Sequence, residues 1–394
     1  MEKGLFHIDE PLIIYIFIVA LPFSWASFAV GSIYRAVTLL LVTVFIVVSK
    51  LKIVIFKNNY RLFASWVLYL GYTILTTLWS VNKEAAITNC MGLILLSFIV
   101  VIFFSTTISK KDSYRIDYCW IITGIVCSIL YLFGDRTSVG EYGSRTSMMI
   151  MGTATDPNEF ASVFIVPLSL LVYEMFSAKK KMNRAILAIV MLVSVYSVLM
   201  SGSRGALISI IVTMLFAYCS NKKMNLKTIM YSALFVVIVI VVTMQFIIPL
   251  IPEDVLMRLS YKALIEDGGS GRSDLWIDAI HKIWNGSPIR MIFGYGQYGL
   301  TVGTIGATQT MHNQLLQQLS NYGIVGLVLY CVLILESFKA IRVRCPRYLG
   351  AFWGMMLMSL TITMSVAYKL LWILLLIPAV ISSGDNSGET DYGQ

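Results

Sequence analysis

Runs of apolar residues, each long enough for a transmembrane helix, recur along nearly the whole chain. A helix that crosses a bilayer needs about 20 such residues. Of the 394 residues, 58% are hydrophobic and only 13% are charged. A soluble globular chain carries about 25% charged residues. The sequence therefore predicts an integral membrane protein, for which the bilayer acts as solvent.

The predicted fold class is an all-α polytopic membrane protein with about twelve transmembrane helices. Backbone groups inside lipid must be paired within their own segment, which favours helices, and the period-2 alternation of a membrane β-barrel is absent. The apolar runs place these helices at about 11–30, 33–49, 62–81, 85–107, 114–134, 157–177, 184–200, 205–220, 228–250, 314–338, 348–367 and 370–382. The last of them is short for a full crossing, which suggests a tilted or re-entrant helix.

Four regions follow from this pattern. Residues 1–250 hold the first nine helices, and residues 251–311 form one large loop, rich in charge and glycine, that contains short helices. Residues 312–382 hold the last three helices. Residues 383–394 read as a disordered tail, because they are polar and carry few apolar residues.

Lysine and arginine predict which side of the membrane each loop occupies. Most basic residues of the short loops fall in one alternate set, namely Lys50, Lys52, Lys57, Arg61, Lys110, Lys111, Arg115, Lys179, Lys180, Lys181, Arg184, Lys222, Lys223, Lys227, Lys339, Arg342, Arg344 and Arg347. By the positive-inside rule these loops and both termini are cytoplasmic. The large loop is then extracytoplasmic. The net charge of +9 has this origin and does not indicate nucleic acid as a partner.

Arg204 is the first candidate for chemistry, since it lies in Ser-Gly-Ser-Arg-Gly between two apolar runs. A charge so close to the membrane is costly, and small flanking residues let another backbone or a ligand approach. An arginine that snorkels to lipid phosphates is the alternative.

Arg272 stands in the large loop, before a helix that Ser273 or Asp274 is expected to begin and in which Trp276, Ile277 and Ile280 form an apolar stripe. A guanidinium beside exposed N–H groups of a helix N-terminus suits phosphate. A solvated loop arginine is the alternative.

His312 is expected at the outer surface of the membrane, where the tenth helix begins. Leu315, Leu316, Leu319 and Ile324 are predicted as the buried positions of that helix. An imidazole titrates near neutral pH, as a general base requires. A purely structural histidine remains the alternative.

Several further polar residues of the outer side are weaker candidates. Asp156 and Pro157 predict a helix start, with Asp156 as the cap, which leaves Asn158 and Glu159 facing the outer end of the bundle. Arg145 precedes them in the same outer loop. Tyr295 and Tyr298 could stack on a sugar ring, although packing within the loop explains them equally well.

Other patterns predict no chemistry. Gly294-Tyr295-Gly296-Gln297-Tyr298-Gly299 matches a dinucleotide motif but lacks its strand–turn–helix context, so we expect a flexible turn. Asp274 and Asp278 have no histidine partner at ligand spacing, and the six cysteines are not clustered. No metal, disulfide or cofactor is expected.

Taken together, the motifs resemble the O-antigen ligase/polymerase superfamily. The resemblance rests on Ser-Gly-Ser-Arg204-Gly, Ser-Gly-Arg272-x-x-x-Trp276, Phe-Gly294-Tyr-Gly296, His312-Asn313-x-x-Leu and Asp156-Pro157-Asn158-Glu159-Phe160, in that family's order and with its topology. It implies a metal-independent, inverting glycosyltransferase of GT-C-like fold in the bacterial inner membrane, with its site facing the periplasm.

By the same resemblance the donor is a glycan on undecaprenyl pyrophosphate. Arg204 and Arg272 would bind the pyrophosphate and His312 would deprotonate or orient the acceptor, with Asn313, Asn158, Glu159, Arg145 and Tyr295 in support. A repeat-unit polymerase of lipopolysaccharide or other surface polysaccharide is favoured, acting with a flippase and a chain-length regulator. A ligase that transfers finished polysaccharide to lipid A–core or another acceptor is the alternative, and a flippase or transporter is a third hypothesis.

Overall fold

The structure is a computed structural model. It describes the whole chain except residues 1–9, 25–26, 29–30, 50–52, 54, 140–144, 151, 178–180, 221–224, 261–270, 301, 303–309, 365–368 and 382–394. The predicted tail at 383–394 therefore lies outside the described residues.

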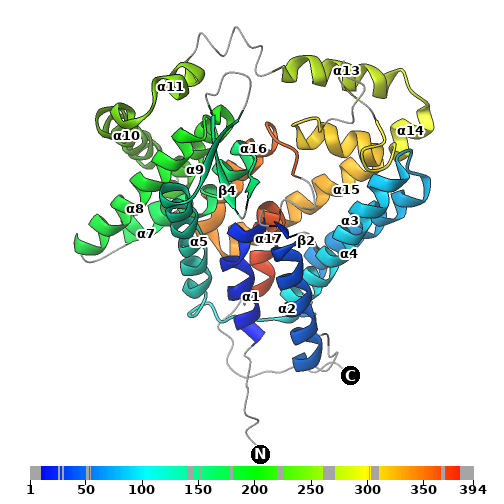
Figure 1. Ribbon diagram of the computed structural model, residues 1–394. Coiled ribbons are helices and arrows are strands. Elements are labelled where there is room, and N and C mark those ends of the chain that lie inside the picture. Colours follow the sequence, from blue (N-terminus) through cyan, green and yellow to red (C-terminus); the bar gives the residue numbers. More distant parts are fainter. Residues whose placement is uncertain are drawn as a thin grey trace, which may run out of the picture.

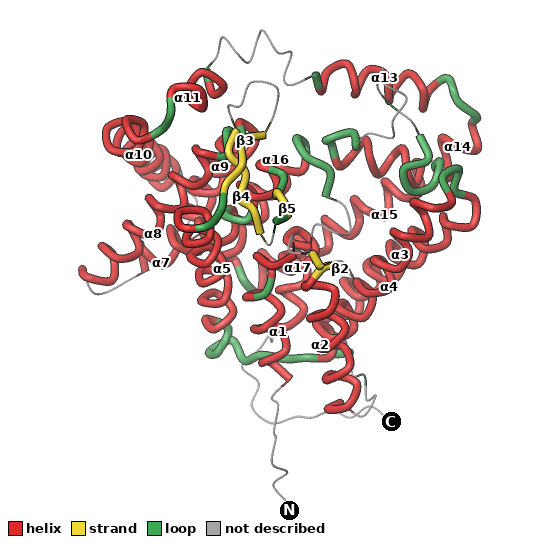
Figure 2. The backbone as a smooth tube through the Cα atoms, viewed as in Figure 1, coloured by secondary structure: helices red, strands yellow, loops and turns green. Residues whose placement is uncertain are grey.

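Helices make up nearly all of the described chain (Figures 1 and 2). The α-helices are α1 (Glu10–Val19), α2 (Ile33–Ser49), α3 (Tyr60–Leu75), α4 (Lys83–Ser105), α5 (Tyr114–Phe133), α6 (Pro157–Ser162), α7 (Ile165–Ser177), α8 (Lys181–Met200), α9 (Arg204–Ser220), α10 (Leu226–Val242), α11 (Glu253–Leu259), α13 (Arg272–Trp284), α14 (Pro288–Phe293), α15 (Gln314–Arg344), α16 (Leu349–Ser359) and α17 (Lys369–Val380). Single-turn helices are η1 (Leu21–Ser24), η2 (Lys57–Asn59), η3 (Thr76–Trp79), η4 (Thr243–Ile247), η5 (Ile248–Leu250) and η6 (Pro346–Tyr348).

Two small antiparallel sheets depart from the all-α expectation. Strands β1 (Ser27–Phe28) and β2 (Gly31–Ser32) form one of them. Strands β3 (Arg136–Val139), β4 (Arg145–Ile150) and β5 (Thr153–Ala154) form the other, in the order β3-β4-β5. These strands lie in connections between helices, where their short length leaves the helical class of the protein unchanged.

Six helical segments of the described chain are long and apolar enough to cross a membrane. They are Lys57–Trp79, Lys83–Ser105, Tyr114–Phe133, Pro157–Phe176, Leu226–Leu250 and Gln314–Arg344. Shorter apolar helices lie at Arg35–Ser49, Arg184–Met200, Arg204–Ser220 and Lys369–Val380. An integral membrane protein is therefore supported, while the expected count of twelve crossings stays a prediction.

Two predicted spans end early. Helix α1 stops at Val19, because Pro22 in η1 has no N–H to continue the helix and restricts the residue before it. Helix α16 stops at Ser359, where the side-chain hydroxyls of Ser359 and Thr361 donate to the backbone carbonyls of Met356 and Met358. Such side-chain bonds compete with the continuation of a helix.

Helix α17 occupies the centre of the bundle. Its residues from Leu370 to Val380 are buried, and Trp372, in its first turn, packs against Trp66 and Tyr69 of α3. The shortness of this helix is thus accommodated by complete burial among its neighbours.

Small residues allow α16 to approach α9 closely. A β-carbon added at Gly350 would lie 2.6 Å from the Thr213 carbonyl oxygen, and one at Gly354 would collide with the Thr213 side chain. Gly205 likewise has no room for a β-carbon beside Thr361. Close backbone approach through small residues is the usual way that membrane helices pack. This packing fixes α9, whose first residue is Arg204.

Three of the loops predicted to be cytoplasmic, those near Asn58, Ile108 and Arg344, come together at one end of the molecule. The Arg344 guanidinium donates to Asn58 and Pro378 carbonyl oxygens at 2.6 and 2.8 Å. Ile108 and Ile381 form an isolated bridge at the same end. Loops that the charge pattern assigns to one side of the membrane therefore lie side by side.

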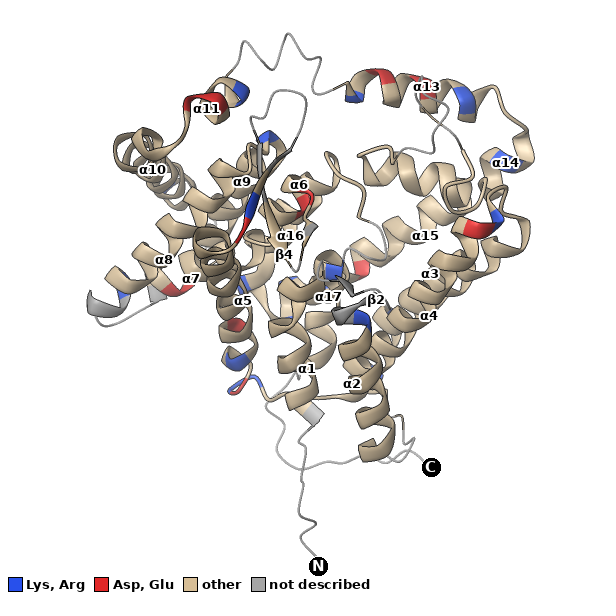
Figure 3. Cartoon of the chain, viewed as in Figure 1, with Lys and Arg blue, Asp and Glu red and all other residues tan. Residues whose placement is uncertain are grey.

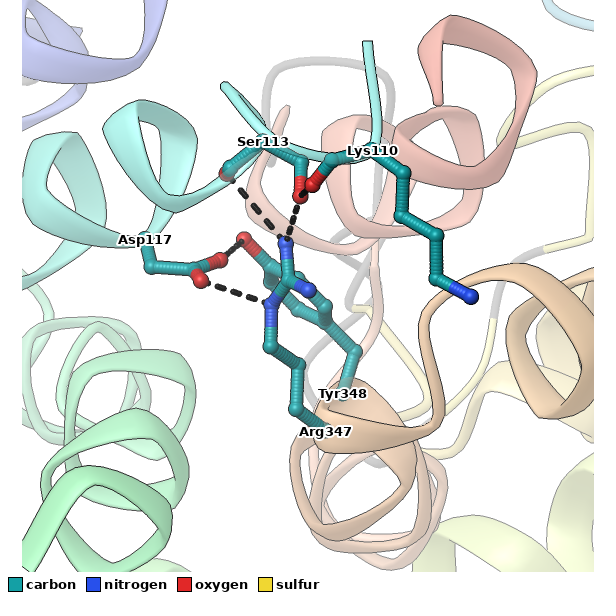
Figure 4. A network of polar contacts seen from close by, with 5 residues as sticks. All are labelled: Lys110, Ser113, Asp117, Arg347 and Tyr348. Atoms are coloured by element: carbon teal, nitrogen blue, oxygen red, sulfur yellow. Dashed lines mark hydrogen bonds and ion pairs between the residues drawn. The ribbon is translucent and has the colours of Figure 1, made fainter. Parts of the chain in front are cut away.

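A buried ion pair joins two helices at this end (Figure 4). The Arg347 Nε and Asp117 Oδ2 atoms lie 2.6 Å apart, and the Tyr348 hydroxyl donates to Asp117 Oδ1 at 2.6 Å. Arg347 also donates to the Ser113 hydroxyl oxygen at 2.8 Å. Because a buried charge needs such partners, this network holds η6 against the start of α5. Most of the bundle is otherwise free of charge (Figure 3).

Candidate functional site

Arg204 is the first residue of α9 and follows a tight turn. Gly202 in that turn has φ 61°, a backbone conformation that glycine adopts without strain. The Arg204 side chain is half-buried, and its Nε and Nη2 atoms donate to the Arg258 carbonyl oxygen at 2.9 and 2.6 Å. Helix α11, which contains Arg258, therefore fixes the plane of the Arg204 guanidinium.

Asn158 reaches the same turn from α6. The Ser203 hydroxyl donates to Asn158 Oδ1 at 2.9 Å, and both residues are buried. Asp156 caps α6 as predicted, since its carboxylate accepts from the N–H groups of Asn158 and Glu159 at 2.8 and 3.1 Å. The structure thus brings Asn158 together with the Arg204 turn, a link that sequence spacing does not reveal.

Arg272 is the first residue of α13, one residue earlier than predicted. The preceding Gly271 is the N-cap, with φ 68°, and no side chain caps the helix. The apolar residues of this helix differ in burial. Ala279 and Ile283 are the buried positions, whereas Ile277 and Ile280 are exposed and Trp276 is half-buried.

Trp276 connects the Arg272 helix with the segment that leads to His312. Its indole Nε1 donates to the Met311 carbonyl oxygen at 2.8 Å. Beside this bond, Ala279 and Met311 belong to a small buried cluster that is separate from the main core. Arg272, one turn before Trp276, and His312, directly after Met311, are therefore held at one junction.

His312 has an unusual backbone conformation at this junction. Its φ is 47°, which is uncommon for a residue with a side chain. The half-buried ring places Nε2 3.4 Å from the Thr310 hydroxyl oxygen. Asn313, the next residue, is the N-cap of α15, because its Oδ1 accepts from the Leu316 N–H at 3.1 Å. Asn313 thus stabilises the start of α15.

The predicted buried face of α15 is wrong. Leu315 and Ile324 are exposed, and Leu316 and Leu319 are only half-buried. The first turns instead bury a polar face made of Gln314, Gln317, Gln318 and Asn321. Apolar side chains are stable where they face lipid. The amide side chains instead face the protein interior, where other protein groups form hydrogen bonds with them.

Each of these amides has a hydrogen-bond partner from another segment. Gln317 accepts from the Met311 N–H at 3.0 Å and donates to Asn321 Oδ1 at 2.9 Å. Asn321 donates to Gln297 Oε1 at 2.8 Å. Gln318 accepts from Tyr69 at 3.0 Å, and Gln314 accepts from the Met364 N–H at 2.7 Å. The sequence analysis did not predict this network. The signal that could have shown it is the recurrence of glutamine and asparagine every three or four residues, on one face of α15.

The glycine motif forms a packed turn and is not a flexible one. Gly294 and Gly296 have φ 84° and 81° and are buried against Asn321 and Ser80. The Tyr295 hydroxyl lies 3.4 Å from the Lys282 carbonyl oxygen, to which it donates. Packing against α13 therefore accounts for Tyr295.

Tyr298 of this turn lies within the electrostatic reach of Glu159. Burial raises the pKa of the Tyr298 phenol, and the negative charge of Glu159 raises it further, against the effect of a hydrogen bond with Gln297. Helix α6 and the glycine turn are thus near each other.

Arg145 begins strand β4, where its backbone pairs with Val139. Its side chain lies outside the described residues. Among the residues that the structure describes, no group of three histidine, cysteine, aspartate or glutamate side chains is placed to hold a metal ion. All six cysteines are free thiols.

The candidate residues therefore form two groups. Asn158, Glu159 and Arg204 lie on α6 and α9, and Arg272, Tyr295, His312 and Asn313 lie around α13 and the start of α15. Both groups lie toward the end of the molecule that carries α11 and α13, opposite the end near the first turn of α1 (Figure 1). The charge of Glu159 acts on Tyr298, which lies in the same glycine turn as Tyr295, so the two groups are near each other.

Comparison with known proteins adds family information. Residues 188–331 match the family model of the O-antigen ligase. This range includes Arg204, Arg272 and His312, while Asn158 and Glu159 precede it. No curated protein matches the chain. This part of the chain is therefore similar to the O-antigen ligase family, which confirms the predicted resemblance to the O-antigen ligase/polymerase superfamily.

Proposed function

We propose that the protein is a surface-polysaccharide polymerase. It transfers a growing glycan from undecaprenyl pyrophosphate onto the next lipid-linked repeat unit, with inversion at the anomeric carbon. The match of residues 188–331 to the O-antigen ligase family supports glycosyl transfer in polysaccharide assembly. The single observation that carries the assignment of residues is the bond from Trp276 to Met311, which joins the Arg272 helix to His312.

The two arginines bind the pyrophosphate in this proposal. A guanidinium presents planar, parallel N–H donors that fit phosphate oxygens, and it stays charged at any physiological pH. Arg204 is oriented by the Arg258 carbonyl oxygen, and Arg272 begins a helix, where backbone N–H groups favour an anion. Both groups stabilise the negative charge that develops on the leaving pyrophosphate.

His312 acts as the base. The acceptor hydroxyl oxygen attacks the anomeric carbon, its proton passes to the imidazole, and the carbon–oxygen bond to pyrophosphate breaks with the electron pair leaving on the lipid pyrophosphate. The step needs no metal or cofactor, since the arginines neutralise the leaving group. General base catalysis of this kind contributes about 10²–10⁴-fold.

In this proposal the remaining site residues position the two arginines, His312 and the acceptor. Asn158 holds the Arg204 turn through Ser203, and Asn313 caps the helix that follows His312. Glu159 on α6 and Arg145 on β4 are assigned to the side of the site that meets the acceptor, and Tyr295 fixes the glycine turn against α13. We place the site on the periplasmic face of the bacterial inner membrane, with both termini cytoplasmic, and expect a flippase and a chain-length regulator as partners.

The ligase reaction is the second candidate, because the matching family is described as O-antigen ligase. A ligase uses the same donor and the same leaving group. It differs in its acceptor, which is lipid A–core or another molecule in place of a second lipid-linked repeat unit.

One experiment separates the two reactions. The purified protein in lipid vesicles is incubated with lipid-linked repeat units alone, and the glycans are separated by length. A polymerase produces a ladder of longer glycans. A ligase produces nothing until a second acceptor is added.

The same assay tests the enzyme hypothesis against transport. Arg272→Ala and His312→Ala variants that insert normally should lose product. Normal polymer from both variants would contradict catalysis at this site and favour a flippase or transporter.

A further inference from the structure

Helix α13 in the large loop has three distinct faces. One face is packed on the protein, because Ala279 and Ile283 are buried and Leu275 packs against the small buried cluster. A second face carries the exposed polar residues Asp274, His281 and Lys282. At 100° per residue these two faces leave a third sector between them.

The third face of α13 is apolar and exposed. Ile277, Ile280 and Trp284 lie within one sector of the helix, and 57%, 49% and 73% of their surfaces are exposed. Scattered single apolar residues are normal on a protein surface, but a contiguous apolar face beside a charged one marks an interaction surface.

Helix α14 extends this apolar face toward a membrane span. Ile289 is 68% exposed, and Ile292 and Phe293 are exposed beside it. The helix is fixed on η3, since Arg290 Nη1 donates to the Trp79 carbonyl oxygen at 2.8 Å. The Trp79 indole in turn lies 3.3 Å from the Phe293 carbonyl oxygen, to which it donates.

Exposed apolar residues of α3 and η3 lead toward α14. Exposed apolar residues occur along this span at Val67 and Leu68, two helical turns later at Leu75, and about one turn after that at Leu78. The segment Lys57–Trp79 is long and apolar enough to cross a membrane, so its exposed stripe faces lipid. Leu78, at 71% exposure, precedes Trp79, to which α14 is bonded.

We propose that α13 and α14 lie in the outer interface of the bilayer. In this position Ile277, Ile280 and Trp284 enter the boundary of the acyl chains, while the polar face of α13 meets water. Continuity with the lipid-facing stripe of α3 selects lipid as the occupant of the apolar face. Interfacial helices have this division into apolar and charged faces, and tryptophan is enriched at the membrane surface. Figure 1 shows α13 lying across the end of the bundle, in a direction different from that of α1 and α2.

The placement has a consequence for Arg272, which begins the same helix. The residue would lie near the depth of lipid phosphate groups, where a lipid-linked pyrophosphate arrives by lateral diffusion. This consequence rests on the proposed function, whereas the position of the helices in the interface does not.

Spin-label depth measurements test the placement. Cys90 and Cys331, the two cysteines that are not buried, are replaced by serine so that the four buried thiols remain unlabelled. Single cysteines are then introduced at Ile277 and Ile280, with Asp274 and His281 as matched controls on the polar face. The labelled proteins are placed in vesicles of phosphatidylethanolamine and phosphatidylglycerol.

The expected result is a reversal between the two faces of the helix. Labels at Ile277 and Ile280 collide mainly with oxygen, which concentrates in lipid, and labels at Asp274 and His281 collide mainly with a water-soluble nickel chelate. Preference for the nickel chelate at all four positions would place α13 in water and overturn the proposal. Exclusion of both reagents at Ile277 and Ile280 would show that protein, such as a second copy of the chain, covers the face, and would also overturn it.

A second measurement keeps the native cysteines. Tryptophan fluorescence of the native protein and of Trp284→Phe is recorded in vesicles of brominated phosphatidylcholine. The difference between the two emission spectra, which represents Trp284, should be lost relative to unbrominated vesicles. An unquenched difference spectrum would contradict the interfacial position. Neither measurement requires enzymatic activity, so failure of the proposed function leaves both readouts intact.

Discussion

The indole nitrogen of Trp276 donates a hydrogen bond of 2.8 Å to the carbonyl oxygen of Met311, the residue before His312. Residues 35 positions apart are thereby joined, and the helix that Arg272 begins is tied to the candidate base. The link connects the large loop with the start of α15.

Trp276→Phe should therefore weaken catalysis more than folding. The change removes the donor and keeps most of the ring, so the free energy of unfolding should fall by only about 0.5–1.5 kcal/mol. Polymer formation should fall further, because the segment before His312 loses its hydrogen bond to the helix that Arg272 begins. Rates in the vesicle assay are compared with those of Trp284→Phe, the same substitution at an exposed tryptophan. Equal rates for both variants would disprove a positioning role for Trp276.

His312→Asn tests the base. Asparagine tolerates positive φ better than most residues, so the backbone at φ 47° should be kept. Polymer formation should fall by about 10²–10⁴-fold with an unchanged unfolding temperature. His281→Asn, in the exposed part of α13, provides the matched control. Retained activity in His312→Asn would assign this histidine a structural role only.

Arg204→Lys tests whether the guanidinium fork matters beyond its charge. Lysine keeps the charge but cannot make the paired contact of Nε and Nη2 with the Arg258 carbonyl oxygen. Loss of a charge-assisted hydrogen bond costs about 1.5–3 kcal/mol, or about ten- to 150-fold in rate. The control is Arg342→Lys, the same substitution at an exposed arginine in the last turn of α15, and the rates of the two variants are compared. Similar rates for the two variants would argue against a specific role.

Gln317→Leu tests the buried polar network. The Met311 N–H and the Asn321 side chain would each lose a partner, and an unsatisfied buried polar group costs about 1–3 kcal/mol. Thermal unfolding in detergent should therefore shift downward. Gln245→Leu, the same change at an exposed glutamine, should leave the transition in place. A stable Gln317→Leu protein would show that the network is dispensable for folding.

Alkylation of Cys345 tests burial at the opposite end of the molecule. Burial raises the pKa of this thiol to about 12, so at pH 9–10 it stays protonated in the folded protein while an unfolded thiol ionises. Its contribution to stability is thus complete below the unfolded pKa and is lost as the pH rises toward about 12. Mass spectrometry after iodoacetamide at pH 9 should find Cys345 unmodified until the protein is unfolded. Rapid modification of the folded protein would contradict its burial.

The sequence alone determined the features that depend on local chemistry. Long apolar runs predicted the membrane class and most helix positions, because a backbone in lipid has few alternatives to the helix. Asp156 was predicted as a helix cap for an equally local reason, since its carboxylate meets the first N–H groups of α6. The motifs around Arg204, Arg272 and His312 predicted the family.

Tertiary structure alone decided which faces are buried and which residues meet. In water an apolar stripe marks the core, but lipid is as apolar as a core, so Leu315 and Ile324 could lie outside while Gln317 and Asn321 lie inside. For the same reason the apolar pattern of Ile277 and Ile280 did not reveal that both side chains are exposed. The contacts of Asn158 with Ser203 and of Trp276 with Met311 join distant segments, and only the packing of the helices determines such distances.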